Sequence, residues 1–140
     1  MNHCVFCHPE LVPSQNVIFS NDYCLFLQLD DAKEKGVPLE GAGLIVPREH
    51  RETVFDLTKE EWDATYMLLQ EVKTYIDNTY QPDGYNLGWN CGDVGGQHIF
   101  HAHFHVLPRY KDEKMAGKGI RYLFKGKENL RGNNQQKELY

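Results

Sequence analysis

The sequence predicts a single α+β domain built on a mostly antiparallel sheet. Short β-prone runs lie on both sides of one long amphipathic segment, and they do not alternate with helices as the strands of a parallel sheet do. The chain has 140 residues, of which 41% are hydrophobic and 25% are charged. This length and composition are typical of one globular domain with a core of its own.

The first elements are a hairpin and a third strand. Residues 16–20 and 23–29 are apolar and β-prone, and a turn-forming Asn-Asp pair separates them. They therefore predict two strands joined by a tight turn. Residues 29–40 are polar and contain glycine and proline, which predicts a loop. Residues 42–46 predict a third strand, which the following proline ends.

The long helix has the clearest sequence signal. Thr58, followed three residues later by Glu61, forms the pattern of a capping box. Behind this cap, aromatic and aliphatic residues recur at helical spacing, which predicts one core-facing stripe. The stripe comprises Trp62, Tyr66, Leu69, Val72, Ile76 and Tyr80. Turn-forming residues at 82–84 end the helical region.

Two further strands are expected after the helix. Residues 85–91 predict the fourth strand, and a glycine-rich turn, 92–96, leads into a fifth that a proline ends. In that last strand His101, His103 and His105 alternate with apolar residues. Because successive side chains of a strand point to opposite faces, we expect the three imidazoles on one face, roughly 6–7 Å apart, with the intervening residues in the core.

Such a histidine face favours chemistry over packing. Three alternating histidines would add desolvation cost, or like charge on protonation, with no gain in stability. Two interpretations stay open at this point. One is a metal site, since neutral imidazole is a common metal ligand, and the other is a nucleophilic or acid–base site acting on phosphate or acyl groups. The glycine-rich turn is consistent with phosphate binding and equally with a plain hairpin turn.

Charge is unevenly distributed along the chain. The formal net charge is −5, yet residues 109–140 hold nine Lys/Arg against four Asp/Glu, whereas the preceding residues hold six against sixteen. The basic tail is either a solvated appendage or a segment that folds over a site handling anions. No run approaches the ~20 apolar residues that cross a bilayer, and the N-terminus lacks a signal-peptide pattern. We therefore expect a cytoplasmic protein with neither a membrane nor a nucleic-acid partner.

Cys4 and Cys7, separated by two residues, indicate metal or redox chemistry, because disulfides are not expected in an unexported chain. Two thiolates at this spacing can bind one zinc ion, whose structural sites take four ligands in a tetrahedron. With His8 the pair also matches the haem-attachment spacing, and a thioredoxin-like pair is a further alternative. The absence of an export signal and of a surrounding βαβ unit disfavours these two. Cys24 and Cys91 lie in apolar runs typical of buried small hydrophobes.

At the histidines the chain resembles a known family. Residues 101–107, His-Ala-His-Phe-His-Val-Leu, show the pattern that names the histidine triad (HIT) family of nucleotide hydrolases and transferases. Gly-Gly-Gln at 95–97, Pro-Arg-Tyr at 108–110 and Leu-Ile-Val-Pro-Arg-Glu-His at 44–50 agree with this pattern. Cys-Val-Phe-Cys at 4–7 is similar to the zinc-bearing bacterial branch of the family.

The resemblance implies an architecture. HIT proteins have a mostly antiparallel five-stranded sheet with one long helix and a short one, and they usually pair into homodimers. We therefore expect a HIT domain over residues 1–110. The remaining residues, 111–140, would form a basic C-terminal tail that packs on or near the active site.

The resemblance also implies a reaction, namely cleavage at the α-phosphate of a purine nucleotide conjugate such as a phosphoramidate or a dinucleoside polyphosphate. The middle histidine of the triad, His103 here, would be the nucleophile and form a nucleotidyl-histidine that water resolves. An imidazole suits this role because its reference pKa of about 6.5 leaves it largely neutral at pH 7. His105 would contact the phosphate or the leaving group. The other expected catalytic residues are Gln97 and His98.

Nucleotide-binding positions follow from the same resemblance. Asn90 matches a family position that hydrogen-bonds the phosphate. Asp30 lies near the position of the acidic residue that holds the ribose hydroxyls. Phe19 and Leu27 are candidates for stacking on the base, with ordinary core packing as the alternative for each.

The zinc-bearing relatives imply four metal ligands, which are Cys4, Cys7, His50 and His101. The first triad histidine would then be structural, and the other two would be free for catalysis. The chain also departs from the family pattern. Relatives commonly carry Gly-His before the third strand, whereas this chain has Gly-Ala at 41–42. A fourth histidine near the triad is therefore missing.

Two other functions remain as alternatives. A nucleotide-binding regulatory or interaction protein with little turnover fits the same fold, although inactive relatives generally lose the middle histidine. A metallohydrolase would hold a catalytic metal among all three histidines. The outer two are separated by ~13 Å of strand, which is too far to share one ion without a strong bend. The nucleophile interpretation is therefore preferred.

Overall fold

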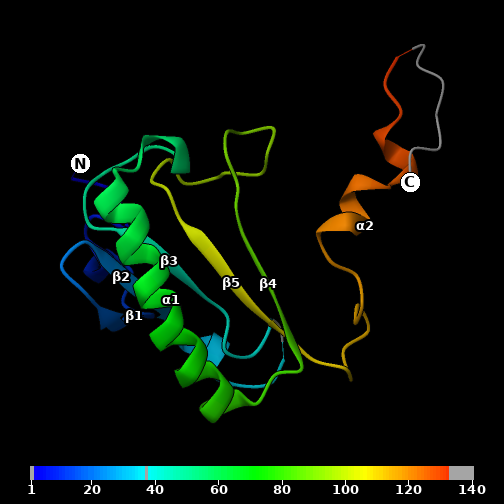
Figure 1. The fold of residues 1–140 in the computed structure, drawn as a ribbon, viewed down its shortest axis with the longest axis horizontal. Helices are drawn as coiled ribbons and strands as arrows, with labels where there is room; N and C mark the ends of the chain where they lie inside the picture. The colour runs from blue at the N-terminus through cyan, green and yellow to red at the C-terminus, as the bar shows by residue number, and fades with distance from the viewer. Residues whose placement is uncertain (1, 37, 133–140) are drawn as a thin grey trace.

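The computed structural model describes residues 2–36 and 38–132. Its strands are β1 (Gln15–Ser20), β2 (Cys24–Leu29), β3 (Gly43–Pro47), β4 (Gly84–Trp89) and β5 (Phe104–Arg109). They form one antiparallel sheet in the order β1-β2-β3-β5-β4, with a long helix, α1 (Lys59–Tyr80), and a short one, α2 (Ile120–Phe124) (Figure 1). The predicted α+β class and five-stranded sheet are confirmed. Within the described ranges, no helix has the length and apolar character needed to cross a membrane.

The face of the sheet that meets α1 holds the larger core. One row of side chains across the sheet, Phe26, Ile45 and Phe104, packs on this side. The buried members of this core are Cys24, Phe26, Ile45, Leu68, Val72, Ile76 and Val106. Burying one large apolar side chain contributes about 1.5–3 kcal/mol. This cluster is therefore the main hydrophobic support of the fold.

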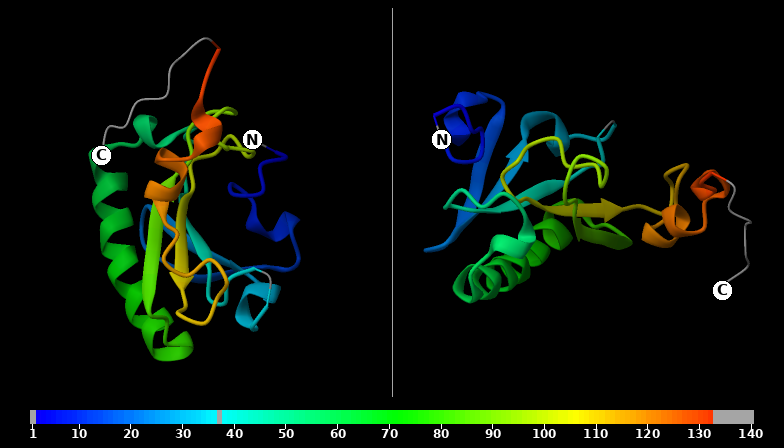
Figure 2. Two further views of the ribbon diagram at one scale, coloured as in Figure 1. Left: turned by 90° about the vertical axis from the view of Figure 1, so that its right-hand side faces the viewer. Right: turned by 90° about the horizontal axis from the view of Figure 1, so that it is seen from above.

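The opposite face of the sheet carries the adjacent row, Leu27, Leu44 and His105, because side chains alternate along each strand. The N-terminal segment lies against this face, on the other side of the sheet from α1 (Figure 2). Phe6 of this segment packs with Leu27 in a second apolar cluster. The histidine face is thus built between the sheet and the N-terminus.

Helix α1 begins at the predicted capping box. The Thr58 hydroxyl accepts from the backbone N–H of Glu61, and the Glu61 carboxylate accepts from the backbone N–H of Thr58. The predicted core stripe is wrong at this end of the helix, since Trp62 and Tyr66 are 51% and 62% exposed. The buried residues of the helix are instead Glu61, Thr65, Leu68, Val72 and Ile76.

An ion pair between the buried Glu61 and the partly exposed Arg51 explains the rotation of the helix. The Arg51 Nε donates to both carboxylate oxygens of Glu61, at 2.9 and 3.1 Å. This contact draws Glu61 inward, so the residue that follows it turns outward. Trp62 then stacks on Trp89 of β4, with ring centroids 5.8 Å apart. Helical periodicity alone does not reveal a charged residue that faces the core.

The histidine strand is shorter than predicted. β5 begins at Phe104, so His105 lies in the strand while His101 and His103 precede it. The backbone N–H of Ala102 donates to the carbonyl of Arg51 at 2.6 Å. This bond joins the triad loop to the segment after β3. At Ala102 it replaces the hydrogen bonds that a neighbouring strand would make. The first two histidines therefore occupy a loop that is fixed from the side.

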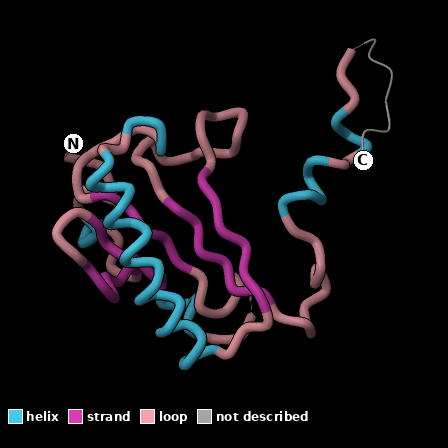
Figure 3. Tube along the Cα trace, viewed as in Figure 1, coloured by secondary structure: helices cyan, strands magenta, loops and turns pink. Residues whose placement is uncertain are grey.

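The basic tail leaves the domain at the end of β5. The Arg109 guanidinium anchors its first residues, donating to the Glu113 carboxylate at 2.8 Å and to the carbonyl of Lys118 at 2.7 Å. Beyond this anchor, residues 119–132 extend past β4 and away from the sheet (Figure 1, Figure 3). Packing of the tail on or near the active site stays a prediction. Residues 133–140 lie outside the described residues.

Replacing Glu61 by Gln tests the ion pair between Arg51 and Glu61. Burial would raise the pKa of this carboxyl, but hydrogen bonds from Arg51 and Thr58 outweigh burial and lower it. A lowered folded-state pKa gives stability that is present above the unfolded pKa of about 4.3 and is lost as pH falls through the folded value. We expect Glu61→Gln to cost about 2–3 kcal/mol at pH 7. The difference from wild type should shrink below about pH 4.

Chemical denaturation at pH 7, 5 and 3.5 measures this difference. The matched control is Glu60→Gln, one residue earlier on the exposed side of the helix, which should change the unfolding free energy by less than about 0.5 kcal/mol. A Glu61→Gln penalty that is equal at all three pH values would contradict the assignment.

Candidate active site and metal centre

His103 has the geometry of a nucleophile. Its Nδ1 lies 2.9 Å from the backbone carbonyl of His101. Since a carbonyl only accepts, the geometry assigns the proton to Nδ1. A neutral imidazole has one protonated and one free nitrogen, so Nε2 keeps its lone pair. The residue is 8% exposed. The backbone thus fixes the tautomer that nucleophilic attack requires.

His105 lies beside the nucleophile, with ring centroids 4.9 Å apart. Burial, and then the neighbouring His103, lower the pKa of His105, so its ring is neutral at pH 7. Within the described residues its Nε2 is buried and has no hydrogen-bond partner. A buried polar atom left unpaired costs about 1–3 kcal/mol. Such an atom is typical of a position that a ligand completes.

Gln97 holds the turn that precedes the triad. Its Oε1 accepts from the backbone N–H of Gly92 at 2.9 Å, and its Nε2 donates to the carbonyls of Glu52 and Ile99 at 2.7 and 3.0 Å. The sequence predicts a substrate contact for Gln97, but the side chain is fully buried and its amide bonds the backbone. These bonds hold the turn, and the substrate contact expected of Gln97 stays a prediction. The turn requires glycine at Gly92 and Gly96, whose φ angles are 79° and 96°.

Asn90 and His98 flank the same turn, and both are exposed. The Asn90 Nδ2 donates to the carbonyl of Gly96 at 3.5 Å, the outer limit of a hydrogen bond. Its amide is therefore available to a better partner. The roles expected of Asn90 in phosphate binding and of His98 in catalysis stay predictions.

Phe19 is on the wrong side of the sheet for the role expected of it. It pairs with Phe26 and packs against Tyr75 of α1, with ring centroids 5.3 Å apart. Strict alternation from Val17, which pairs with Leu27, would place Phe19 on the triad face. A β-bulge between the two reverses this. The prediction that Phe19 stacks on a base is therefore wrong.

The other two nucleoside-binding candidates are Leu27 and Asp30, which differ in exposure. Leu27 points to that face, although the N-terminal cluster buries it. Asp30 directly follows β2, is exposed, and accepts from the Asn16 Nδ2 at 2.7 Å. Their contacts with base and ribose stay predictions.

Four side chains from distant parts of the chain converge at one point. The ligand atoms of Cys4, Cys7, His50 and His101 all lie within 4.8 Å of one another. The Cys4 Sγ is 3.3 Å from the His101 Nδ1, the Cys7 Sγ is 3.4 Å from the His50 Nδ1, and the two Nδ1 atoms are 3.3 Å apart. A zinc tetrahedron with Zn–S of ~2.3 Å and Zn–N of ~2.05 Å has N–N edges of ~3.3 Å and S–N edges of ~3.5 Å. These three separations fit those edges.

Protonation also suits a metal at this cluster. Burial lowers the pKa of His101 to about 4, so the ring is neutral. Its Nε2 donates to the carbonyl of Pro47 at 2.8 Å, which leaves the lone pair of Nδ1 facing the cysteines. Burial, and then Cys4, raise the pKa of Cys7 to about 11. A bound cation would instead lower the pKa of Cys7, because it stabilises the thiolate.

Two residues that shape the site carry no distinctive sequence signal. Arg51 provides the carbonyl that fixes Ala102, and Phe6 packs against the rings of His101 and His103. The one hint for Phe6 is its place between the two cysteines. No sequence pattern marks a backbone carbonyl as a catalytic support.

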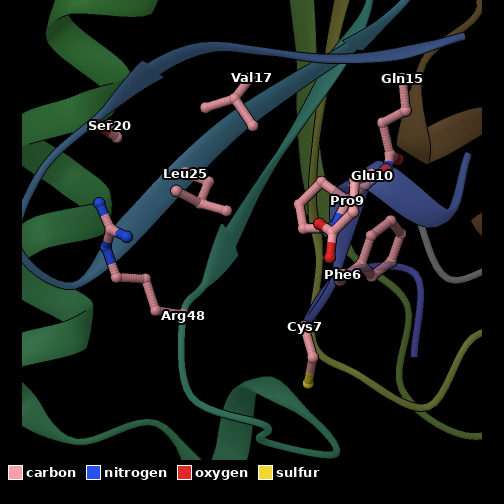
Figure 4. Close-up of a pocket in the computed structure, with 9 residues that line it drawn as sticks. All are labelled: Phe6, Cys7, Pro9, Glu10, Gln15, Val17, Ser20, Leu25 and Arg48. Carbon is pink, nitrogen blue, oxygen red and sulfur yellow. The ribbon is translucent and has the colours of Figure 1, made fainter. Parts of the chain in front are cut away.

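A cavity of about 530 Å³ lies on the triad side of the sheet, over β1 and β2 (Figure 4). The side chains around it are Phe6, Cys7, Pro9, Glu10, Gln15, Val17, Ser20, Leu25 and Arg48. It borders the metal cluster through Cys7 and includes none of the three triad histidines. The cavity and the nucleophile thus lie at different parts of this face, with Phe6 in contact with both.

Comparison with known proteins agrees with this geometry. The model of the HIT domain matches residues 10–112. The chain belongs to the HIT family. The protein hit of Bacillus subtilis is 28% identical over 77% of this chain and 72% of its own length. A HIT family protein from Bacillus anthracis has a similar solved structure, with a TM-score of 0.67 and 26% identity over 79% of this chain and 76% of that one.

Two relatives have named activities, and this chain matches about half of each. The bis(5′-adenosyl)-triphosphatase of Dictyostelium discoideum is 32% identical over 52% of this chain and 49% of its own length. The adenosine 5′-monophosphoramidase of Schizosaccharomyces pombe is 30% identical over 57% of each. A zinc-bound histidine triad protein from Mycobacterium smegmatis has a TM-score of 0.66 at 23% identity, covering 84% of this chain and 83% of that one. At that identity the likeness shows the fold alone.

Gln97→Leu should release the glycine-rich turn. The variant leaves the Gly92 N–H and the carbonyls of Glu52 and Ile99 without their partner, which we expect to cost about 2–4 kcal/mol. Native-state hydrogen exchange should show faster exchange at the Gly92 amide. The exposed neighbour Asn90, changed to Ala, serves as control and should leave that amide protected. Unchanged protection of Gly92 in Gln97→Leu would show that the side chain does not hold the turn.

Proposed function

We propose that this protein is a nucleotide hydrolase that cleaves at the α-phosphate of a purine nucleotide conjugate, through a nucleotidyl-histidine on His103. The observation that carries the proposal is the 2.9 Å hydrogen bond from the His103 Nδ1 to the His101 carbonyl. It leaves Nε2 with the lone pair that a nucleophile needs. Membership of a family that includes hydrolases supports the reaction class.

The relatives with named activities support the substrate class. A bis(5′-adenosyl) triphosphate and an adenosine monophosphoramidate carry different leaving groups. Both present an α-phosphorus that bears a nucleoside. A nucleophile aimed at this phosphorus acts on either, and the leaving-group pocket then decides which is preferred. We accordingly propose a phosphoramidate or a dinucleoside polyphosphate as the substrate.

The proposed reaction has two displacements at phosphorus. Attack by the His103 Nε2 forms a P–N bond while the bond to the leaving group breaks, and the leaving group departs with that electron pair and takes up a proton. Water then attacks the same phosphorus, the P–N bond breaks, and a proton is released as neutral imidazole returns. The His101 carbonyl holds Nδ1–H throughout, and it stabilises the positive charge of the nucleotidylated ring.

The remaining roles follow from position. His105, with its unpartnered buried Nε2, would contact the phosphate oxygens or the leaving group. Asn90 and His98, exposed beside the turn, would contact the phosphate and the leaving-group side. Asp30 would bind the ribose.

We further propose that Cys4, Cys7, His50 and His101 hold a structural zinc ion. Zinc in this site would stabilise the two thiolates and tie the N-terminus to the loops that carry the histidines. Among residues 2–36 and 38–132, this is the one cluster with metal-ligand geometry, and it contains neither His103 nor His105. The metallohydrolase alternative is therefore disfavoured.

A homodimer would give the tail a place to bind. β4 is an edge strand of the sheet, and residues 119–132 extend past it (Figure 1). Ile120 and Leu123 of this tail are exposed on a segment with basic neighbours, whereas the domain body is acidic. A tail that points away from its own triad can pack on a second copy. We propose that it contributes to leaving-group selection there.

His103→Asn tests the nucleophile. The change keeps a polar side chain and removes the attacking nitrogen, so turnover should fall by about 10³-fold or more, each tenfold being ~1.4 kcal/mol of barrier. Folding and zinc content should be unchanged. The assay uses adenosine and guanosine 5′-phosphoramidates and the corresponding dinucleoside triphosphates. The exposed His3, changed to Asn, is the control and should keep wild-type turnover.

Substantial turnover by a verified His103→Asn protein would defeat the nucleophile assignment. A wild-type protein that binds these nucleotides but turns over none of them would favour the regulatory alternative instead.

Zinc content tests the metal centre. Protein prepared without chelators should carry one zinc per chain, and the double variant Cys4→Ser, Cys7→Ser should carry none. The melting temperature of this double variant should be lower, because a metal ion that binds only the folded state stabilises that state. Cys91→Ser, outside the cluster, should keep the metal. Wild-type protein without stoichiometric metal by elemental analysis would refute the proposal.

A further inference from the structure

The two cysteines of the metal cluster flank a side chain that touches the nucleophile. Phe6 lies between Cys4 and Cys7 and is buried. Its ring centroid is 5.1 Å from that of His103, with the ring planes tilted by 55°, and 5.8 Å from that of His101, edge to face. The short link between two proposed metal ligands therefore carries a ring in contact with two members of the triad.

The orientation of His103 depends on such packing. In the part of the chain that the structure describes, its ring makes one hydrogen bond, from Nδ1 to the His101 carbonyl. The torsion that turns an imidazole about its Cβ–Cγ bond has a broad energy profile, so one bond leaves Nε2 some freedom to swing. Phe6, at 5.1 Å, and His105, at 4.9 Å, are the rings next to it. Their contacts limit that swing.

Phe6 is itself held in place from two directions. Its side chain packs in the apolar cluster that includes Leu27 and Val46. Its backbone is held by its neighbours, since the Cys7 N–H donates to the Cys4 Sγ at 3.4 Å and the His8 N–H donates to the Cys4 carbonyl at 2.9 Å. The cysteine pair therefore helps to fix the backbone that carries the ring.

We propose that Phe6 is a positioning residue for His103. It holds the imidazole so that Nε2 points at the α-phosphorus, and through its flanking cysteines it makes that orientation depend on the metal centre. An apolar ring suits this task because it restricts rotation without offering a polar atom that would compete for Nε2. The inference rests on the proposed role of His103 as nucleophile.

Phe6→Leu tests the inference, because leucine keeps an apolar side chain and removes the flat ring. The control is Val72→Ala, which weakens the larger core on the other face of the sheet, away from Phe6 and His103. Three quantities are measured on each full-length protein: zinc per chain, kcat and KM with adenosine 5′-phosphoramidate, and the ¹H–¹⁵N spectrum of the His103 ring. The spectrum reports which nitrogen carries the proton and whether the ring is ordered.

We expect Phe6→Leu to keep its zinc, to lower kcat about tenfold or more with KM within twofold, and to show a broadened or mixed-tautomer His103 signal. Val72→Ala should lower the melting temperature and keep the wild-type kcat and spectrum. A Phe6→Leu protein with wild-type kcat and a sharp His103 signal would overturn the inference and leave the proposed function standing. If the wild-type protein is inert, the proposed function fails, and the spectra alone decide whether Phe6 orders His103.

Discussion

The site depends on the hydrogen bond between the His101 carbonyl and the His103 Nδ1. His101 makes three directed contacts at once. Its Nδ1 faces Cys4 and Cys7, its Nε2 donates to the carbonyl of Pro47, and its own carbonyl fixes the tautomer of His103. One residue therefore joins the metal cluster, the end of β3 and the nucleophile. A shift of His101 would disturb all three.

The segment after β3 keeps His101 in that position. Its backbone carbonyls bond the triad loop twice, to the Ala102 N–H and to the Gln97 amide. The Arg51 side chain in turn binds Glu61, which caps α1. The start of the long helix and the histidine loop thus share one support. This explains why a carboxylate, rather than the aromatic residue beside it, occupies the core face of the helix.

Local pattern in the sequence predicts most of this arrangement. The strands, the cap of α1 and the convergence of the cysteines with His50 and His101 follow from turn residues, periodicity and the family motif. The errors come from contacts between distant segments. Arg51 rotates the helix away from the Trp62 stripe and bends the chain before β5, and one bulge moves Phe19 to the other face. A hydrogen bond between remote parts of the chain leaves no periodic signal in the sequence. These features can therefore be identified only from the three-dimensional structure.

The central claim is that the His103 Nε2 attacks phosphorus. The most direct measurement is to quench a reaction with adenosine 5′-phosphoramidate within its first turnover, digest the protein under conditions that preserve P–N bonds, and map the adenylylated peptide by mass spectrometry. We expect one adenylyl group on His103 that is lost on longer incubation. An adduct on His105 or His98, or steady turnover with no adduct at any quench time, would contradict it.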